Sequence, residues 1–555
     1  MKNILIAIRS IFKKGRHNVM KIVSLGIGLA VGLVLIAKVY FEQSYDDFYP
    51  DRDRVYQVWA KYQQNGGELK DYPQTSGGIA PTMQQQIPEI ETVTRYTSFG
   101  DWTFTMTDTK MKYSGRCIIA DSCFFDILPR PMLIGNAKEV LSTPMYVLIS
   151  SRIAKNIGGD VIGKNFTVDN SPGRTMTIGG VFEEVPENSH SRYDVIVSMA
   201  SAGRFMWEGS PTNMLGNDRY ISYVKLHKGV NPLALEEQVR TFVNSYFPPE
   251  EQQKVGLSID FSFHKLDNLH KELPQVKRMT WILSLLAFAL IFTAVMNYIL
   301  IVISSIVNRS KEVAVHKCYG ASENNIHGMM FGEALVHIVL SLILALLLIL
   351  AFRGTVEELL ATSLDSLLLS NGSLVLLGIC ILVFFVSGFM PGSLYARIPV
   401  ASAFRNYREN KRIWKKALLL VQFVATGFLV TMLVFVARQY TFMVNDRPGY
   451  AYENLAYCGL AGVDSTSRAK ILDEVMRLPG VAAATTFYQL PFEHASGNNI
   501  LLPGGTQELF NIADLYWVGN GYLDMMEIPV IQGRSFTENV TNSREVMVDR
   551  RFVEK

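Results

Sequence analysis

Five stretches of the chain are apolar over a length that suits a membrane-spanning helix. They lie at residues 22–40, 281–307, 329–352, 374–395 and 417–437, and a helix needs about 20 apolar residues to cross the hydrocarbon core. Residues 41–276 instead mix alternating runs such as "RTMTIGGVFEEV" and "DVIVSMA" with helical runs such as "LEEQVRTFVNSYF". The pattern predicts a multi-pass α-helical membrane protein with a large α+β extracytoplasmic domain.

The residues before the first apolar stretch also carry a helical pattern. In "NILIAIRSIFKKGRHN", apolar side chains recur at helical spacing opposite basic ones, which is typical of an amphipathic helix on the inner membrane face. A basic topology signal without this helix is the alternative. The following "LIAKVYFEQS" offers no small-residue cleavage site, so residues 22–40 are predicted to be an uncleaved anchor.

Charge in the flanks of the spans predicts the orientation. The net charge is only +3, but Lys and Arg gather at residues 1–21, 308–326 and 396–416, whereas the connection at 353–372 carries three acidic residues and only a boundary Arg353. Basic flanks stay on the cytosolic side. Residues 41–276 and 438–555 are therefore expected outside, and no basic patch suggests nucleic acid as a partner.

The predicted organisation follows from these two patterns. In chain order it is a cytosolic amphipathic helix (1–21), span 1 (22–40), an outer domain (41–276), span 2 (281–307), a cytosolic helix (308–326), span 3 (329–352), a short outer loop (353–372), span 4 (374–395), a basic cytosolic linker (396–416), span 5 (417–437) and a second outer segment (438–555).

The second outer segment repeats part of the first. "FFDILPRPMLIG" at 124–135 aligns with "YLDMMEIPVIQG" at 522–533, and "VLISSRIAKN" matches "VMVDRRFVEK" near the end of the chain. A constant offset near 400 residues indicates a tandem duplication. Because Lys555 corresponds to Asn156, the second copy is predicted to be incomplete, with roughly 240 further residues and three more spans expected by symmetry.

One segment of the outer domain comes close to a nucleotide-binding loop. "GGDVIGKN", residues 158–165, has Gly, four residues, Gly and Lys, but Asn165 stands where a hydroxyl would bind Mg²⁺. The segment follows a helical run and precedes strands, whereas a phosphate loop leads from a strand into a helix. We therefore interpret it as a glycine turn, on the side of the membrane without cytosolic ATP.

No catalytic, metal or cofactor site is predicted. The five cysteines lack a CxxC pair, so they indicate no zinc site. Cys117 and Cys123 are expected as two separate buried thiols, with a disulfide as the alternative. The histidines expected outside (His190, His227, His264, His270 and His494) show no ligand spacing. Asn297 and His337 lie within predicted spans, where bonding to a neighbouring helix is favoured over substrate binding.

The cytosolic segment after span 2 carries the most specific motif. "RSKEVAVHKCYGAS" at 309–322 resembles the Arg-x-x-Glu-(Ile/Val)-(Gly/Ala)-(Val/Ile)-(Arg/His)-Lys-x-x-Gly-Ala-(Ser/Thr) signature of FtsX-like permeases, the membrane subunits of MacB-type ABC systems. Further segments are similar to other motifs of the family. One is "IPVASAFR" at 398–405. "DVIGKNFTV" and "IGGVFEEVPENSHSRYDVIVS" are similar to the MacB-like periplasmic core domain. The layout is similar to duplicated permeases common in Bacteroidetes.

The resemblance implies a non-enzymatic permease subunit in the bacterial inner membrane, which couples a separate cytosolic ABC ATPase dimer to movement of periplasmic domains. Expected cargoes are antimicrobial peptides, drugs or lipoproteins, and expected partners are membrane lipids and a periplasmic adaptor or outer-membrane protein. ATP would bind to the partner ATPase, so no cofactor is expected in this chain. The alternative is an FtsX-like regulator of a cell-wall hydrolase or of an antibiotic-sensing complex.

The same resemblance places the ATPase contact on the short helix after span 2. The matching positions are Arg309, Glu312, Val315, Lys317 and Gly320. Cys318 and Tyr319 depart from the family pattern, which favours small or aliphatic residues there. A helix with a charged and an apolar face is suited to transmit a rigid-body push from a bound partner.

Overall fold

A computed structural model of the chain describes residues 17–554, except for 65, 66, 68, 169–172, 217, 370–371, 397–398, 401–412, 446–448, 461–462, 492–495, 503–507 and 537–544. The amphipathic helix predicted at the N-terminus falls almost entirely on residues 1–16, outside the described residues, as do most of the basic linker and His494. The chain divides into two compact units, Met1–Phe428 and Leu429–Lys555, which are described separately.

Five helices among the described residues are long and apolar enough to cross a membrane. They are α2 (Asn18–Gln43), α10 (Pro274–Ser304), α12 (Glu323–Ala351), α15 (Ser373–Ala396) and α17 (Ile413–Asn445). Each contains most or all of one predicted apolar stretch and extends beyond it at one or both ends. The second differs most, because the helix breaks after Ser304 instead of continuing to residue 307.

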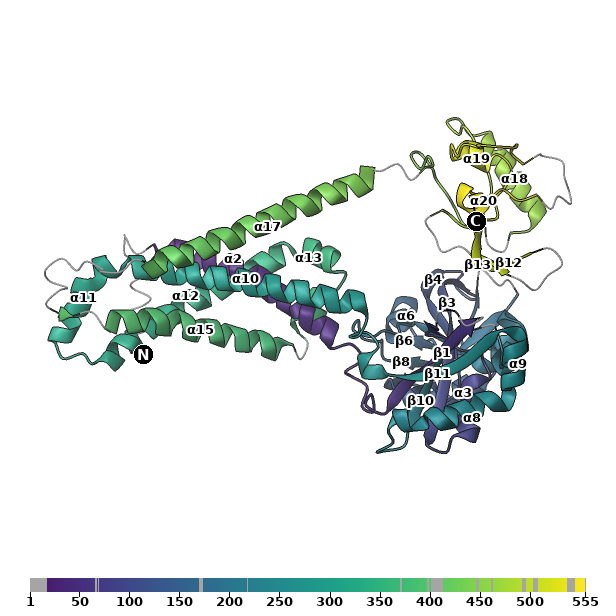
Figure 1. Ribbon diagram of the computed structural model, residues 1–555, viewed down its shortest axis with the longest axis horizontal. Helices are drawn as coiled ribbons and strands as arrows, with labels where there is room; N and C mark the ends of the chain where they lie inside the picture. Colours follow the sequence, from purple (N-terminus) through teal and green to yellow (C-terminus); the bar gives the residue numbers. More distant parts are fainter. Residues whose placement is uncertain are drawn as a thin grey trace. The chain divides into compact units, whose positions relative to one another are not determined.

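The first four of these helices pack into one bundle, in which α2 contacts both α10 and α12 (Figure 1). The core includes Leu25, Tyr298 and Ile338, each at most 3% exposed. Two glycines of α2 allow close packing on α10: a Cβ added at Gly28 would lie 2.2 Å from the Cβ of Ala294, and one at Gly32 would lie 2.4 Å from Ile291. Small residues four positions apart are a common device for close approach of membrane helices.

The segment between α2 and α10 forms an α+β domain around a mixed sheet. Its described strands are β1 (Val55–Gln64), β2 (Lys70–Tyr72), β3 (Ile90–Met106), β4 (Lys112–Ala120), β5 (Met132–Ile134), β6 (Tyr146–Ser150), β7 (Asn165–Val168), β8 (Thr175–Phe182), β9 (Val195–Ser198), β10 (Ile221–Leu226) and β11 (Leu257–Lys265). The main path runs β11-β1-β10-β3-β4-β9-β6-β8-β5; β2 pairs with β1, and β7 with β3 and β8. Only the β4–β9 and β6–β8 pairs among the described strands are parallel.

Helices cover the sheet and divide its core into parts. The longer ones are α3 (Ile79–Gln86), α6 (Ser151–Ile157), α8 (Glu236–Tyr246) and α9 (Pro249–Val255), and the shorter ones are α4 (Phe124–Ile127), α5 (Ala137–Ser142) and α7 (Ala202–Phe205). Met83 of α3 and Phe242 of α8 pack with Val224 of β10 in one core cluster. A separate cluster holds Tyr49, Tyr223 and Leu266 where the chain enters and leaves the domain. The alternating runs at 174–185 and 194–200 contain β8 and β9, and the helical run at 235–247 contains α8, as predicted.

Two short helices fold the connection between α12 and α15 onto the bundle. They are α13 (Arg353–Leu360) and α14 (Leu364–Leu368). Leu367 of α14 is 1% exposed and packs with Ala37 and Phe41 of α2. The Ser363 side chain caps α14 by accepting a hydrogen bond from the Ser366 amide. This connection is therefore a packed structure and not a simple turn.

The second unit shares local structure with the first domain where their sequences align. It contains most of α17, α18 (Ser465–Met476), the hairpin of β12 (Ser496–Leu501) and β13 (Glu508–Leu515), α19 (Tyr522–Met525) and α20 (Arg550–Glu554). The aligned pairs α4 with α19 and α6 with α20 are helical in both copies, and the aligned Gly135 and Gly533 have φ values of 84° and 93°. The resemblance between the two segments thus extends from sequence to backbone conformation.

Candidate functional site

The candidate site begins at a break between two helices. α10 ends at Ser304, and α11 (Ile306–Cys318) begins two residues later. The hydroxyl of Tyr395, on α15, donates to the Val302 carbonyl at 3.1 Å and lies 3.1 Å from the Ser305 hydroxyl. Because Tyr395 is fully buried, this contact fixes the break in the core of the bundle. The predicted cytosolic helix therefore starts at Ile306 and is separate from α12, which begins at Glu323.

One face of α11 is buried against the bundle. Ser310, Val313 and Ala314 are each 1% exposed, and Val313 and Ala314 belong to the core cluster of the bundle. Their spacing of three to four residues places them on a single face of the helix. A displacement of α11 must therefore displace the bundle core with it.

The predicted contact residues divide between the faces of α11. Val315 is 43% exposed, and Glu312 is half-buried. The Lys317 ammonium group donates to the Ala396 carbonyl at 2.6 Å, so it binds the C-terminal end of α15, where a cation also suits the helix dipole. Arg309 lies in the same helix, but its side chain is outside what the structure describes.

Gly320 ends α11 with a left-handed backbone conformation. Its φ is +85°, a value that L side chains adopt only with strain. The Gly320 amide donates to the Lys317 carbonyl at 3.0 Å, and the Ala321 amide donates to the His316 carbonyl at 3.0 Å. These two bonds form a Schellman motif. Ser322 then caps α12 through the Asn325 amide, so α11 and α12 are joined by a tight, fully defined turn.

The structure adds Tyr319 to the candidate site. Its side chain is 89% exposed, directly before Gly320. In the sequence, Tyr319 departs from the family pattern, which favours a small or aliphatic residue. Its exposure beside Val315 makes it a candidate anchor for a partner. Tyrosine is enriched among residues that dominate binding energy at protein interfaces. An aromatic side chain next to a helix-ending glycine was the available signal in the sequence.

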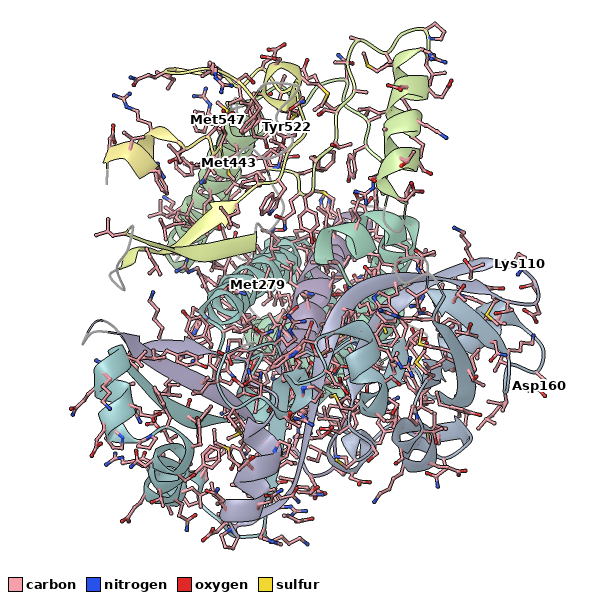
Figure 2. All side chains as sticks on the ribbon, turned by 90° about the vertical axis from the view of Figure 1, so that its right-hand side faces the viewer. Lys110, Asp160, Met279, Met443, Tyr522 and Met547 are labelled. Atoms are coloured by element: carbon pink, nitrogen blue, oxygen red, sulfur yellow. The ribbon has the colours of Figure 1, made fainter. Side chains whose placement is uncertain are left out.

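The segment "GGDVIGKN" is a turn from a helix into a hairpin, as interpreted from the sequence. Gly158 ends α6 with a φ of 74°, and β7 and β8 follow as an antiparallel pair. Lys164 of this segment lies 3.9 Å from the Asp108 carboxylate. Figure 2 shows Asp160 at the surface of the sheet domain, where it is exposed. The order of helix, loop and strand is opposite to that of a phosphate-binding loop.

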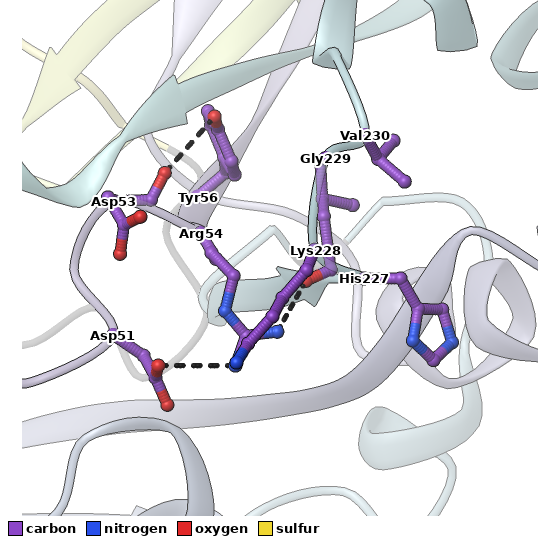
Figure 3. Close-up of a pocket in the computed structure, with 9 residues that line it drawn as sticks. Asp51, Asp53, Arg54, Tyr56, His227, Lys228, Gly229 and Val230 are labelled. Carbon is purple, nitrogen blue, oxygen red and sulfur yellow. Dashed lines mark hydrogen bonds and ion pairs between the residues drawn. The ribbon is translucent and has the colours of Figure 1, made fainter.

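A polar cleft of about 460 Å³ opens beside the start of β1 (Figure 3). Arg54 on its wall binds the Glu91 carboxylate at 2.6 Å and the Asp51 carboxylate at 3.2 Å, and Lys225 lies 2.5 Å from Asp51. The hydrogen bond from Lys225 holds the pKa of Asp51 below its ordinary value, and the bond from Arg54 lowers the pKa of Glu91. These cations already have anionic partners within the chain, so the cleft is a structural ion-pair cluster.

Three histidines of the sheet domain have partners within the domain or its connections, whereas His227 is 57% exposed. His190 bonds Asp46, His270 bonds Glu42, and His264 stacks on Trp59. Within the described residues no three metal-ligating side chains gather into one group. Cys117 and Cys123 are unbonded to each other, and Cys117 is buried while Cys123 is half-buried. Burial raises the pKa of the Cys117 thiol, which keeps it protonated and unreactive.

His337 bonds a neighbouring helix, as favoured from the sequence. Its Nδ1 lies 3.1 Å from the Tyr298 hydroxyl on α10.

Comparisons with known proteins identify both parts of the first unit. Residues 20–242 match the profile of the MacB-like periplasmic core domain, and residues 284–400 match that of the FtsX-like permease C-terminal region. A crystal structure of a domain of a candidate permease protein from Porphyromonas gingivalis is 33% identical, covers 39% of this chain and 91% of its own, and gives a TM-score of 0.36. No curated protein matches the chain.

Proposed function

Because the chain is an inner-membrane ABC transporter permease of the FtsX/MacB type, we propose that it transmits movement from a separate cytosolic ATPase to its sheet domain. Permeases of this kind generally work with such an ATPase. In this proposal α11 receives the push, the bundle carries it, and the sheet domain moves on the outer side. ATP binds to the partner and not to this chain.

The proposed orientation places α11 inside and the sheet domain outside. α10 connects them, since it leaves the domain at Pro274 and reaches α11 after 31 residues, which corresponds to about 46 Å at 1.5 Å per residue. That length exceeds the hydrocarbon thickness of about 30 Å. The basic residues of α11, which are Arg309, Lys311 and Lys317, support the inside position of this end.

The observation that carries the proposal is the division of α11 into two faces. Val313 and Ala314 are held in the bundle core, while Val315 and Tyr319 are exposed beyond it. A partner bound to the exposed side would thus move residues that are fixed to the spans. The tight turn at Gly320 passes the same displacement to α12.

The contact can be tested with a double variant, Val315→Asp with Tyr319→Ser. Both changes remove exposed apolar surface, and the new carboxylate would have to lose its water on binding. We expect at least about tenfold less ATPase to copurify with the full chain from native membranes, which corresponds to 1.4 kcal/mol. The ATPase is identified and quantified by mass spectrometry of the purified complex.

Leu359→Asp is the matched control. Leu359 is 78% exposed on α13, in the connection between α12 and α15, and its substitution should leave ATPase recovery unchanged. Equal recovery from the double variant and the wild type would overturn the assignment of α11, provided that yield and melting temperature are also equal.

We further propose that the sheet domain handles a cargo on the outer side, such as an antimicrobial peptide, a drug or a lipoprotein, together with a periplasmic adaptor or outer-membrane protein. The match to a MacB-like periplasmic core domain supports this. The rival function, control of a cell-wall hydrolase or of an antibiotic-sensing complex, predicts a stable complex with such a protein. Affinity purification of the full chain after crosslinking in cells distinguishes the two by the outer partner recovered.

A further inference from the structure

The two segments that connect the sheet domain to the spans are tied to each other. The Glu42 carboxylate, at the end of α2, lies 2.7 Å from the Lys38 ammonium group and 2.6 Å from Nε2 of His270, which precedes α10. The rings of His270 and Tyr45 stack with centroids 3.4 Å apart. Side chains of Lys38, Glu42 and His270 are 6% to 15% exposed. These contacts join the ends of α2 and α10 into one body.

The sheet domain is hydrogen-bonded to the residues that follow α2. Asp46, which is fully buried, accepts hydrogen bonds from the Ser189 hydroxyl at 3.0 Å and from the His190 amide at 3.3 Å. Its other carboxylate oxygen lies 2.6 Å from Nδ1 of His190. The Asn188 side-chain amide donates to the Ser44 carbonyl at 2.7 Å. Spans 1 and 2 and the sheet domain are thus linked by buried polar contacts, which favour movement as a unit.

A different part of the chain touches this unit through two polar contacts. Thr362, between α13 and α14, accepts a hydrogen bond from the Lys38 ammonium group at 2.8 Å. The next residue, Ser363, donates its backbone amide to the Glu187 carboxylate of the sheet domain at 3.0 Å. Both acceptor and donor belong to the connection between spans 3 and 4. One turn of chain therefore contacts span 1 and the sheet domain at once.

These two contacts differ in kind from the packing around them. Leu367 remains held against Ala37 and Phe41 by apolar contact, whereas the groups bonded to Thr362 and Ser363 can exchange their partners for water if the surfaces separate. Lys38 would keep Glu42 as its counter-ion, and Glu187 would become solvated. Opening at this point leaves no buried charge without a partner, which makes it a suitable place for a reversible separation.

We propose that Thr362 and Ser363, with Lys38 and Glu187, form a latch that holds the sheet domain against the connection between spans 3 and 4 and opens when the ATPase is driven through its nucleotide cycle. The inference rests on the proposed function, since it assigns a regulated contact to the same transmitted movement. The closed latch is the state of this structure. Its opening releases the sheet domain from the connection between spans 3 and 4, which keeps its apolar contact with span 1 through Leu367.

Hydrogen exchange of the full chain, purified in lipid nanodiscs with its ATPase, tests the latch. Peptides that cover residues 353–368 are followed without nucleotide and after trapping with ATP and vanadate. We expect exchange in these peptides to rise about tenfold on trapping, as for a local opening. The double variant Thr362→Val with Glu187→Ala should show the high exchange already without nucleotide and no further rise.

A matched variant, Thr362→Ser with Glu184→Ala, controls for the substitutions themselves. Serine keeps the hydroxyl that accepts from Lys38, and Glu184 is a neighbouring glutamate that pairs with Arg152 at 3.3 Å. This variant should behave as the wild type in both nucleotide states. Wild-type exchange in the Thr362→Val, Glu187→Ala variant without nucleotide would overturn the latch, because the two contacts would then not hold the loop.

Failure of the latch can be separated from failure of the proposed function. If the ATPase copurifies but trapping leaves exchange at residues 353–368 unchanged, the latch is wrong and the transmitting role stands. If ATP and vanadate change nothing because no ATPase binds the chain, both are wrong.

Discussion

The ammonium group of Lys21 lies 3.5 Å from the Glu333 carboxylate, with side-chain exposures of 1% and 7%. It also donates to Asn18 at 3.2 Å. Glu333 lies on one face of α12 with His337 and Ser341, because the three follow one another at intervals of four. His337 bonds the Tyr298 hydroxyl. The Ser341 hydroxyl donates to the Ile22 carbonyl. Lys21 was assigned from the sequence to a basic cytosolic flank. The structure places it inside the bundle, because α2 begins at Asn18.

Removal of one member of this pair should be costly. Lys21→Met leaves the buried Glu333 carboxylate without its cation, and we expect it to lower the free energy of unfolding by about 3 kcal/mol. The double variant Lys21→Met with Glu333→Leu should recover most of that loss, since no charge is then buried. Thermal unfolding of Lys21→Met, of Glu333→Leu and of the double variant in detergent checks this. Additive losses in the double variant would show that the two side chains are not coupled.

At the scale of elements, the packing of α2 on α10 depends on a pair of small residues. A methyl group at Gly28 would lie 2.2 Å from the Cβ of Ala294, which is far inside van der Waals contact, so Gly28→Ala must push the helices apart. We expect a loss of about 1–3 kcal/mol, as for other overpacked cores, measured by thermal unfolding of the full chain. Gly378→Ala is the control, because a Cβ at Gly378 of α15 meets no atom within 4 Å.

The compensating variant Gly28→Ala with Ala294→Gly restores space at the same contact and should recover stability. If Gly28→Ala and Gly378→Ala had equal effects, close packing of α2 on α10 would not be what Gly28 provides.

At the scale of elements, the sequence predicted the helix after span 2 but not the contacts that hold it. Helical patterning is a local property of the chain and predicted a helix at 308–326. The structure has α11 end at Cys318 and α12 begin at Glu323, because the left-handed Gly320 ends the first helix. The role of Lys317 was not accessible in this way, because its bond to the Ala396 carbonyl depends on where α15 ends in space. Tyr395, which fixes the start of α11, is about 90 residues away in sequence. Long-range contacts of this kind leave no periodic signal.

At the scale of the whole molecule, the apolar stretches and the strand alternation predicted a multi-pass protein with an α+β outer domain. The pattern did not predict the order of the strands in the sheet. β4 pairs with β9 in parallel, and β6 pairs with β8 in parallel, between antiparallel neighbours. Alternation identifies which face of a strand is buried but not which strand lies beside it. The contacts of Glu42 with His270 and of Lys38 with Thr362 were missed for the same reason, since they join residues 228 and 324 positions apart.

The orientation of the whole chain can be tested with two of its own cysteines. Cys318, at the end of α11, and Cys458, in the second unit, are both exposed, and the proposed topology puts them on opposite sides of the membrane. In intact spheroplasts, a membrane-impermeant maleimide should label Cys458 and leave Cys318 unmodified until the membrane is permeabilised. Mass spectrometry of the labelled peptides gives the result, and the single variants Cys318→Ser and Cys458→Ser confirm each assignment.

Cys117 serves as an internal reference, because burial raises the pKa of its thiol and should protect it in both conditions. Labelling of Cys318 before permeabilisation would place α11 outside, where no cytosolic ATPase could reach Val315 and Tyr319.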